Sequence, residues 1–128
     1  ATRYITTYPN TKANAEWGEA YRARFKEYPT NWSWENSVGI NFIAAASKKA
    51  NSADGKKIAE AMRGLKIDSP FGADGTVTMR ADDQTVINYA IGWGTTIPQA
   101  PYVPEVTGAK WDTILQLEAE WKKRNNYT

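Results

Sequence analysis

The shortage of predicted strands limits what this chain can form more than any other feature of its sequence. Alternating apolar residues, the pattern of a strand with one buried face, occur at 76–79 and 86–93, and a β-branched and aromatic run covers 4–8. Three strands are few for a sheet that is stable by itself. The chain has 128 residues, enough for one domain with a core. We therefore expect further strands to come from another chain or from the rest of a longer one.

Helical spacing of apolar residues accounts for most of the remaining sequence. The predicted helices cover 13–27, 33–50, 54–63 and 112–124. The second has so wide an apolar stripe that we expect it to be buried on most sides. We predict Ser33 as its N-cap and Gly64 as the left-handed residue after the third helix. Three prolines predict an extended connector over 95–108. The fold class is therefore mixed α/β, and the strand-like residues 1–6 suggest a mature or truncated chain.

The missing residue types exclude several kinds of active site. The sequence has no histidine and no cysteine, which removes Ser-His-Asp and Cys-His sites, the usual zinc ligands and disulfides. No nucleotide-binding glycine motif is present. We predict a protein that is not an enzyme and binds no cofactor. A mechanism that uses two carboxylates remains an alternative. Asp82 and Asp83 would point to opposite sides of an extended segment and so would not share a substrate. The remaining possibility is a glycosidase that uses Glu35 with a distant acid.

Charge and hydropathy exclude two kinds of partner. Acidic and basic residues are interspersed and the net charge is +2, whereas a nucleic-acid interface gathers Lys and Arg on one face. No apolar run approaches the about 20 residues of a membrane span. We predict no nucleic-acid partner and no membrane-spanning segment.

The segment 28–36 is the most informative about function. The chain has six tryptophans and seven tyrosines, more than a core of this size needs, and two of the indoles lie here. Free N–H groups at a helix start favour an anionic or carbonyl group of a ligand, and indoles offer stacking. Trp32 lies outside the helical stripe, so we predict it as a ligand wall. Trp34 is in register with the stripe and is a wall or a core residue, while Ser33 and Glu35 are predicted polar contacts.

The ordered pattern over 25–84 resembles the C-terminal part of ABC-importer solute-binding proteins of the branched-chain amino-acid (Leu/Ile/Val) type. It comprises a helix ending in Y-P, an aromatic residue, an Ala-rich helix, a K-A-N-S-A-D link, a short helix ending in R-G-L, an S-P-F-G turn and M-R-A-D-D-Q before a strand. The matching residues are Phe25, Tyr28, Pro29, Ala50, Ser52, Asp54, Gly64, Leu65, Pro70, Gly72, Met79, Arg80, Ala81, Asp83 and Gln84. No single one of these matches is diagnostic of the family, but their order along the chain is specific for it.

The sequence departs from the family in two places. Glu35-Asn36-Ser37 stands where the family commonly has Tyr-Asp-Ala, near the ligand cleft, so a leucine-like ligand does not follow. The histidine of the family's D-H-Q motif is absent from Asp82-Asp83-Gln84.

The resemblance implies part of a type I periplasmic-binding-protein fold, in which two three-layer α/β lobes close on a ligand like a Venus flytrap. Residues 1–8 would be a crossing strand, and 9–75 the helical contribution to lobe one. Residues 76–84 would cross back, and 85–128 would supply a strand, connector and terminal helix to lobe two. The missing strands would then lie in the N-terminal part of the protein.

The implied function is capture of a small-molecule solute, an amino acid or an aromatic or organic acid, in the bacterial periplasm or another extracytoplasmic space. The implied partners are the N-terminal part of the protein and an ABC permease. The implied site comprises Trp32, Ser33, Trp34 and Glu35, with Phe71 of the Pro-Phe-Gly turn also facing the cleft. The alternative is a self-standing carbohydrate- or peptide-binding module that uses exposed tryptophans.

Overall fold

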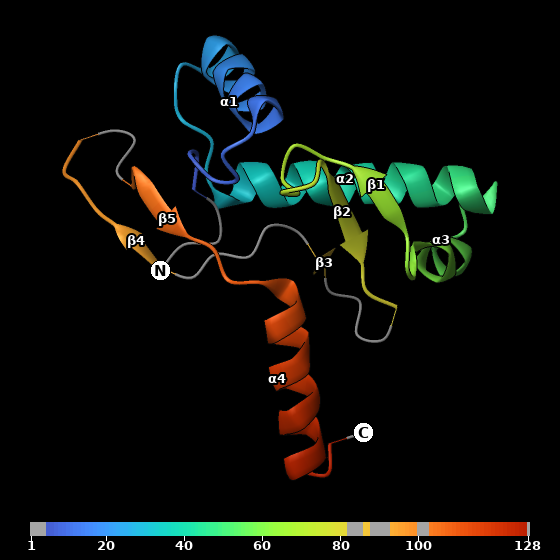
Figure 1. The fold of residues 1–128 in the computed structure, drawn as a ribbon. Helices are drawn as coiled ribbons and strands as arrows, with labels where there is room; N and C mark the ends of the chain where they lie inside the picture. The colour runs from blue at the N-terminus through green and yellow to red at the C-terminus, as the bar shows by residue number, and fades with distance from the viewer. Residues whose placement is uncertain (1–4, 82–85, 88–92, 100–102, 128) are drawn as a thin grey trace.

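The structure of the protein, a computed structural model, describes residues 5–81, 86–87, 93–99 and 103–127 (Figure 1). Its helices are α1 (Lys12–Phe25), α2 (Asn31–Ala50), α3 (Gly55–Met62) and α4 (Trp111–Arg124). Its strands are β1 (Lys66–Asp68), β2 (Thr76–Met79), β3 (Val86–Ile87), β4 (Trp93–Thr95) and β5 (Glu105–Thr107). The mixed α/β class predicted from the sequence is confirmed.

The long helix α2 is the centre of the arrangement. Figure 1 shows β1 and β2 crossing it, α3 beneath its C-terminal end, α1 at its other end and α4 projecting away. The strands β1, β2 and β3 form one antiparallel sheet, with Ile67 opposite Val77 and Met79 opposite Val86. The strands β4 and β5 form a separate antiparallel pair with Gly94 opposite Val106.

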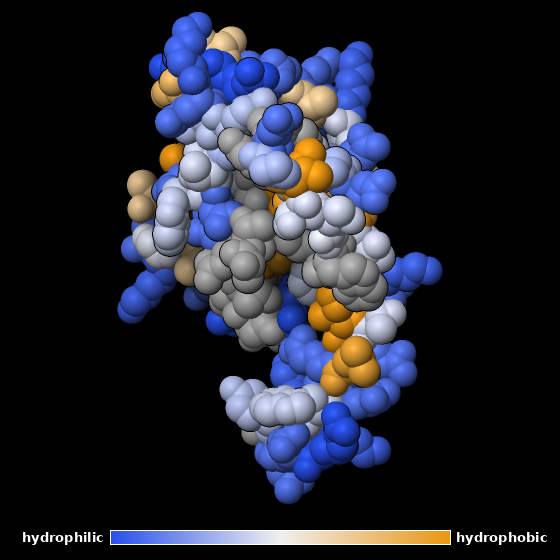
Figure 2. Space-filling model, turned by 90° about the vertical axis from the view of Figure 1, so that its left-hand side faces the viewer, coloured by the Kyte–Doolittle hydropathy of each residue, from blue (hydrophilic) through white to orange (hydrophobic). Residues whose placement is uncertain are grey.

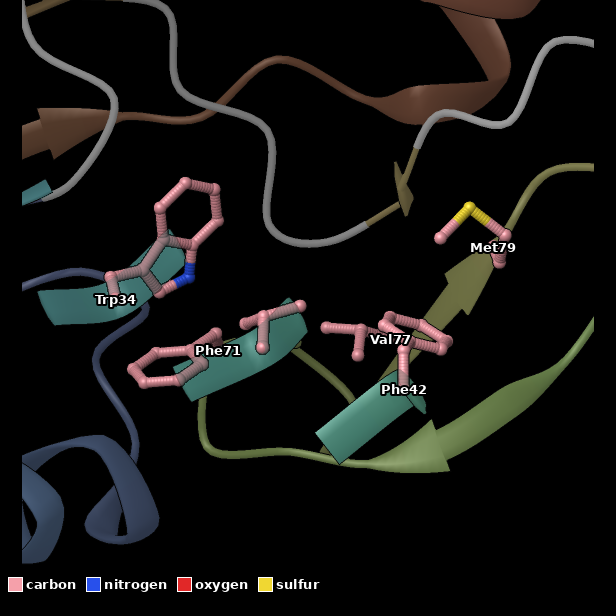
Figure 3. Packing of buried hydrophobic residues seen from close by; sticks show 6 residues of the cluster. Trp34, Phe42, Phe71, Val77 and Met79 are labelled. Carbon is pink, nitrogen blue, oxygen red and sulfur yellow. The ribbon is translucent and has the colours of Figure 1, made fainter. Parts of the chain in front are cut away.

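The core lies between α2 and the β1–β2 sheet. Four α2 residues spaced four apart are buried on one stripe, and the first three of them form one cluster with Phe71, Val77 and Met79 (Figure 3). The four are Trp34, Val38, Phe42 and Ala46. Because a spacing of four keeps residues on one helix face, the stripe packs against the flat side of the strands.

The opposite side of α2 is exposed in this chain. Ile40 is 65% exposed and Ile43 is 53% exposed. The prediction that α2 is buried on most sides is therefore wrong for this chain, because the described residues supply a packing layer on one side only. The surface seen in Figure 2 is mostly hydrophilic with separate apolar patches.

The helix predictions are confirmed with shifted ends. Helix α1 ends at Phe25, where Lys26 takes the left-handed conformation with φ 61°, two residues before the predicted stop. Helix α2 begins at Asn31 because Thr30, and not Ser33, is its N-cap. Asp54 caps α3, and Gly64 has the predicted positive φ of 67°.

The strand predictions are confirmed in part. The strand at 76–79 has the predicted bounds. In the segment predicted as one strand over 86–93, β3 covers 86–87 and Trp93 begins β4, while 88–92 lie outside the described residues. The predicted connector over 95–108 contains β5, and β1 was not predicted, because a three-residue strand with one inward residue has no readable alternation.

Residues 5–8 form a turn and not the predicted strand; residue 4 lies outside the described range. The Tyr8 amide donates to the Ile5 carbonyl at 3.0 Å. The buried Asn14 side chain donates to the carbonyls of Thr6 and Pro9, at 3.0 and 3.2 Å, and so holds the turn against α1. Thr7 Oγ1 also donates to the carbonyl of Val103 at 2.7 Å, which links the turn to the segment before β5.

Candidate functional site

The start of α2 is a capped helix terminus that carries most of the predicted site. The Thr30 hydroxyl accepts from the Ser33 amide, and the Ser33 hydroxyl accepts from the Thr30 amide at 3.2 Å. This reciprocal pair is a capping box, and it fixes the direction in which the first turn presents its side chains. Trp32 is 70% exposed and Trp34 is 9% exposed. The division of the two indoles predicted from the helical stripe is thus confirmed as a difference in burial.

Trp34 and Phe71 belong to one aromatic cluster in the core. Their rings meet edge to face with centroids 6.2 Å apart, and Phe71 meets Trp17 of α1 in the same way at 4.7 Å. Such edge-to-face pairs add to the stabilisation from burial. Figure 3 places Trp34 and Phe71 together at one end of the core, away from Met79. Phe71 is 1% exposed, so it acts here as a core residue, and its contact with a ligand stays a prediction.

The Ser33 side chain is engaged in holding two helices together. Its hydroxyl lies 2.9 Å from the Tyr21 hydroxyl of α1, to which it donates, in addition to its place in the capping box. The structure therefore gives Ser33 a structural role, and a ligand that accepted a hydrogen bond from its hydroxyl would replace the bond to Tyr21.

Glu35 borders an apolar groove of about 310 Å³ between α2, α3 and the strands. Its lining residues are Trp34, Glu35, Val38, Gly39, Phe42, Ile43, Met62, Met79 and Val86. Glu35 is half-buried and is the one charged residue in that lining. The groove would accept an apolar group beside a carboxylate.

A second, more polar cleft of about 330 Å³ lies between the turn at 6–11 and α1. Its lining includes Thr6, Thr7, Asn14, Arg22 and Tyr28. The Arg22 guanidinium lies 4.4 Å from the centre of the Tyr28 ring, a cation–π contact. The sequence reasoning missed this cleft.

One signal in the sequence could have pointed to it. Asn14 lies three positions before Trp17 and seven before Tyr21, on the inward stripe of α1. A polar side chain on such a stripe must find hydrogen-bond partners inside the protein. Asn14 finds them in the turn that forms one wall of the cleft.

In the sequence, Trp32 lies between the residues that border the two hollows. Pro29 borders the polar cleft and Trp34 borders the apolar groove. The site predicted from the sequence is therefore divided: Trp32 offers an exposed indole for stacking, Glu35 borders the apolar groove, and Ser33, Trp34 and Phe71 hold the local structure.

The acidic side chains and the helix lengths of the described residues bear on two other kinds of site. Over the described ranges, no three His, Cys, Asp or Glu side chains gather in a way that could hold a metal ion. None of the helices in the described part of the chain is long and apolar enough to cross a membrane.

Residues 1–92 match the family model of the periplasmic binding proteins. No curated protein sequence matches the chain.

Several solved structures are similar to the chain, each with a TM-score above 0.5. One is a solute-binding protein of an ABC transporter from Rhodopseudomonas palustris BisB5, in complex with 3,4-dihydroxybenzoic acid, with 26% identity and a TM-score of 0.58. The match covers 67% of this chain and 23% of that protein. An amino-acid ABC transporter substrate-binding protein from Pseudomonas fluorescens Pf-5 has 26% identity and a TM-score of 0.58, and the match covers 78% of this chain and 27% of that one.

A third structure supports the fold alone because its sequence identity is 19%. It is an ABC-type branched-chain amino-acid transporter from Rhodopseudomonas palustris CGA009, with a TM-score of 0.57, and the match covers 85% of this chain and 28% of that protein. This chain thus spans about a quarter of the length of the structures that it matches. Its neighbours have the type I periplasmic-binding-protein fold, of which the chain supplies a part.

Proposed function

Because the chain belongs to the periplasmic binding protein family, we propose that it forms the C-terminal part of a solute-binding protein that captures a small molecule for an ABC importer. Such a protein acts outside the cytoplasm and delivers its ligand to a permease. The ligand would favour a closed form by contacting both lobes, which is a shift between two populated states. The rest of the binding cleft would come from the N-terminal part of the protein.

The observation that carries the proposal is the exposed indole of Trp32 on a fixed helix start. The capping box holds the first turn of α2, and the Ser33–Tyr21 hydrogen bond ties that turn to α1. An aromatic side chain on a rigid support loses little conformational entropy when it binds a planar or apolar group. Trp32 is therefore our proposed ligand wall, with Glu35 as a polar contact beside it.

The ligand class that we propose is an amino acid, of the branched-chain type or another, or an aromatic or organic acid. Trp32 could stack on an aromatic ring, and Glu35 could bind an ammonium group. Because Glu35-Asn36-Ser37 departs from the family pattern, a leucine-like side chain does not follow for the ligand, and the indole with its neighbouring carboxylate favours an aromatic or amine-bearing solute.

The test is a thermal-shift titration of the whole protein that contains this chain, with 3,4-dihydroxybenzoate, leucine and phenylalanine as probes. A ligand at 100 times its Kd raises the free energy of unfolding by about 2.7 kcal/mol, so a true ligand gives a clear rise in Tm. If no probe of either class raises Tm, the proposed ligand classes are wrong.

A matched pair of variants tests the place of the site. The variant Trp32→Ala should weaken binding of the active probe by about twofold to thirteenfold, which corresponds to the loss of one aromatic contact of about 0.5–1.5 kcal/mol. The control is Trp121→Ala, which removes a second exposed indole, 49% exposed, on α4. If the Trp32 variant and the unaltered protein bound the probe with equal affinity, Trp32 would not be part of the ligand site.

A further inference from the structure

Helix α4 is only partly enclosed by the rest of the described chain. It projects from the body in Figure 1, and none of its residues is buried in the described structure. It also lies beyond residues 1–92, the range of the family match. The contacts that hold α4 in place are therefore different from those that hold the core.

One stripe of α4 is half-buried, and the two halves of that stripe differ in chemistry. The half-buried residues recur at helical spacing and are Trp111, Ile114, Leu115, Glu118 and Lys122. The first half of the stripe is apolar, and the second half is charged. Figure 2 shows that the surface at the lower end of the molecule, formed by α4, is mostly hydrophilic.

The charged half of the stripe meets the end of β2 in a triad formed by Arg80, Glu118 and Lys122. Arg80 directly follows β2 and donates through both terminal nitrogens to the two Glu118 carboxylate oxygens, at 2.9 and 3.1 Å. Lys122 Nζ lies 2.6 Å from Oε1 of the same carboxylate. The Arg80 side chain is 12% exposed and that of Glu118 is 26% exposed.

This geometry makes the triad stronger than an ordinary surface ion pair. Two parallel N–H···O bonds between a guanidinium and a carboxylate fix orientation as well as distance. Partial burial of both side chains reduces screening by solvent and salt. By contrast, the Lys12–Glu16 pair of α1 is fully at the surface, with side chains 89% and 65% exposed, and such pairs contribute little.

We propose that the Arg80–Glu118–Lys122 triad is a clasp that holds the second half of α4 to the end of β2, so that breaking it releases this part of α4 while the core stays folded. The proposal concerns a conformational device within this chain and is independent of the proposed solute-binding function. The released segment would not remain helical, because a helix as short as these 14 residues is marginal in water without tertiary contacts. Release would therefore appear as loss of amide protection.

Hydrogen exchange of the whole protein that contains this chain, followed by mass spectrometry, tests the clasp through Glu118→Gln. The variant keeps the shape of the side chain and removes its charge. We expect the amides of 118–124 to exchange at least tenfold faster, and the amides of 38–46 in α2 to be unchanged. The control is Glu120→Gln, because Glu120 is an exposed carboxylate on the same helix that accepts a hydrogen bond from Gln116. The control should leave both regions unchanged.

Three outcomes would overturn the proposal. The first is unchanged exchange in 118–124 of the Glu118 variant, and the second is an equal acceleration in α2, which would make the triad a part of the core. The third is an equal effect of Glu120→Gln, which would reveal a general effect of helix charge.

A salt titration of the unaltered chain decides the matter if the Glu118 variant does not fold. Exchange of 118–124 should accelerate relative to α2 between 50 mM and 1 M NaCl, because salt screens the triad and leaves the apolar core in place. A constant ratio between the two regions over this range would contradict the clasp.

Discussion

The helices α2 and α4 are held to the β1–β2–β3 sheet by different chemistry. Helix α2 has four buried residues on one stripe, and three of them cluster with the sheet and Phe71. Helix α4 has none, and a charged triad joins it to β2. Apolar burial acts without direction and scales with area, whereas an ion pair acts only at one geometry and depends on solvent. The position of α2 should therefore tolerate changes of salt and pH that move α4.

The largest expected effect comes from removing a ring in the α2 core. Phe42 is 1% exposed, and Phe42→Ala should lower the free energy of unfolding by about 3–5 kcal/mol, since it removes buried area and leaves a cavity. The matched control is Leu117→Ala on α4, at a residue that is 56% exposed. Urea denaturation followed by circular dichroism measures both. A loss for the Leu117 variant as large as that for the Phe42 variant would break the contrast between the helices.

An intermediate effect is expected in the turn that joins β1 to β2. A Cβ added at Gly72 would lie 1.6 Å from the Thr76 carbonyl oxygen, so the backbone must shift in Gly72→Ala. We expect a loss of about 1–3 kcal/mol, the usual range for overpacking.

The control for this turn lies in α1. At Gly18 an added Cβ meets no atom within 4 Å, and Gly18→Ala should stabilise the helix by about 0.5–1 kcal/mol. The same denaturation experiment compares the two variants. A neutral Gly72→Ala would mean that the turn is held less firmly than the α2 core beside it.

The smallest expected effect is the loss of protection of α4 in acid. It distinguishes the two helices, because α2 should not become less protected over the same pH range. Hydrogen bonds from Arg80, then from Lys122, lower the pKa of Glu118 below its ordinary value of 4.5. The folded chain therefore holds this proton less readily than the unfolded chain. The stabilisation from Glu118 is fully present above pH 4.5 and is lost as the pH falls through the lowered pKa.

Hydrogen exchange as a function of pH checks this expectation, with rates corrected for their intrinsic pH dependence. Protection of 118–124 should decline below pH 4.5 in the unaltered chain and be independent of this titration in Glu118→Gln. The comparison with Glu118→Gln is needed because Asp74 also has a lowered pKa, chiefly through its hydrogen bonds from Thr76, and its titration contributes to the pH profile of both proteins. Identical pH profiles for the two proteins would show that Glu118 does not control α4.

The sequence predicted the helices well because each carries its own periodic signal. It predicted β2 for the same reason, but not β1 or β5, which have three residues each. The turn at 5–8 was read as a strand because its sequence is β-branched and aromatic. What bends it is the Asn14 side chain, which lies on α1 and reaches back to Thr6. That contact is tertiary, and no local pattern reports it.

The candidate site, like the fold, could be predicted where a local pattern determines it and not where tertiary contacts do. The register of the α2 stripe separated Trp34 from Trp32 correctly, since burial follows helical spacing. The part of Ser33 in a capping box was not predicted, because it depends on Thr30 being the N-cap, whereas the sequence analysis assigned that position to Ser33. The burial of Phe71 could not be foreseen, because it depends on Trp17 and Trp34 arriving from two different helices.

The hydrogen bond between Thr7 Oγ1 and the Val103 carbonyl has a mechanical consequence. It joins residues 96 positions apart, and the whole core lies in the stretch between them. If the chain were pulled at points just before Thr7 and just after Val103, part of the load would pass through this contact and the turn around it. Opening of this link would transfer that load to the stretch that contains the core.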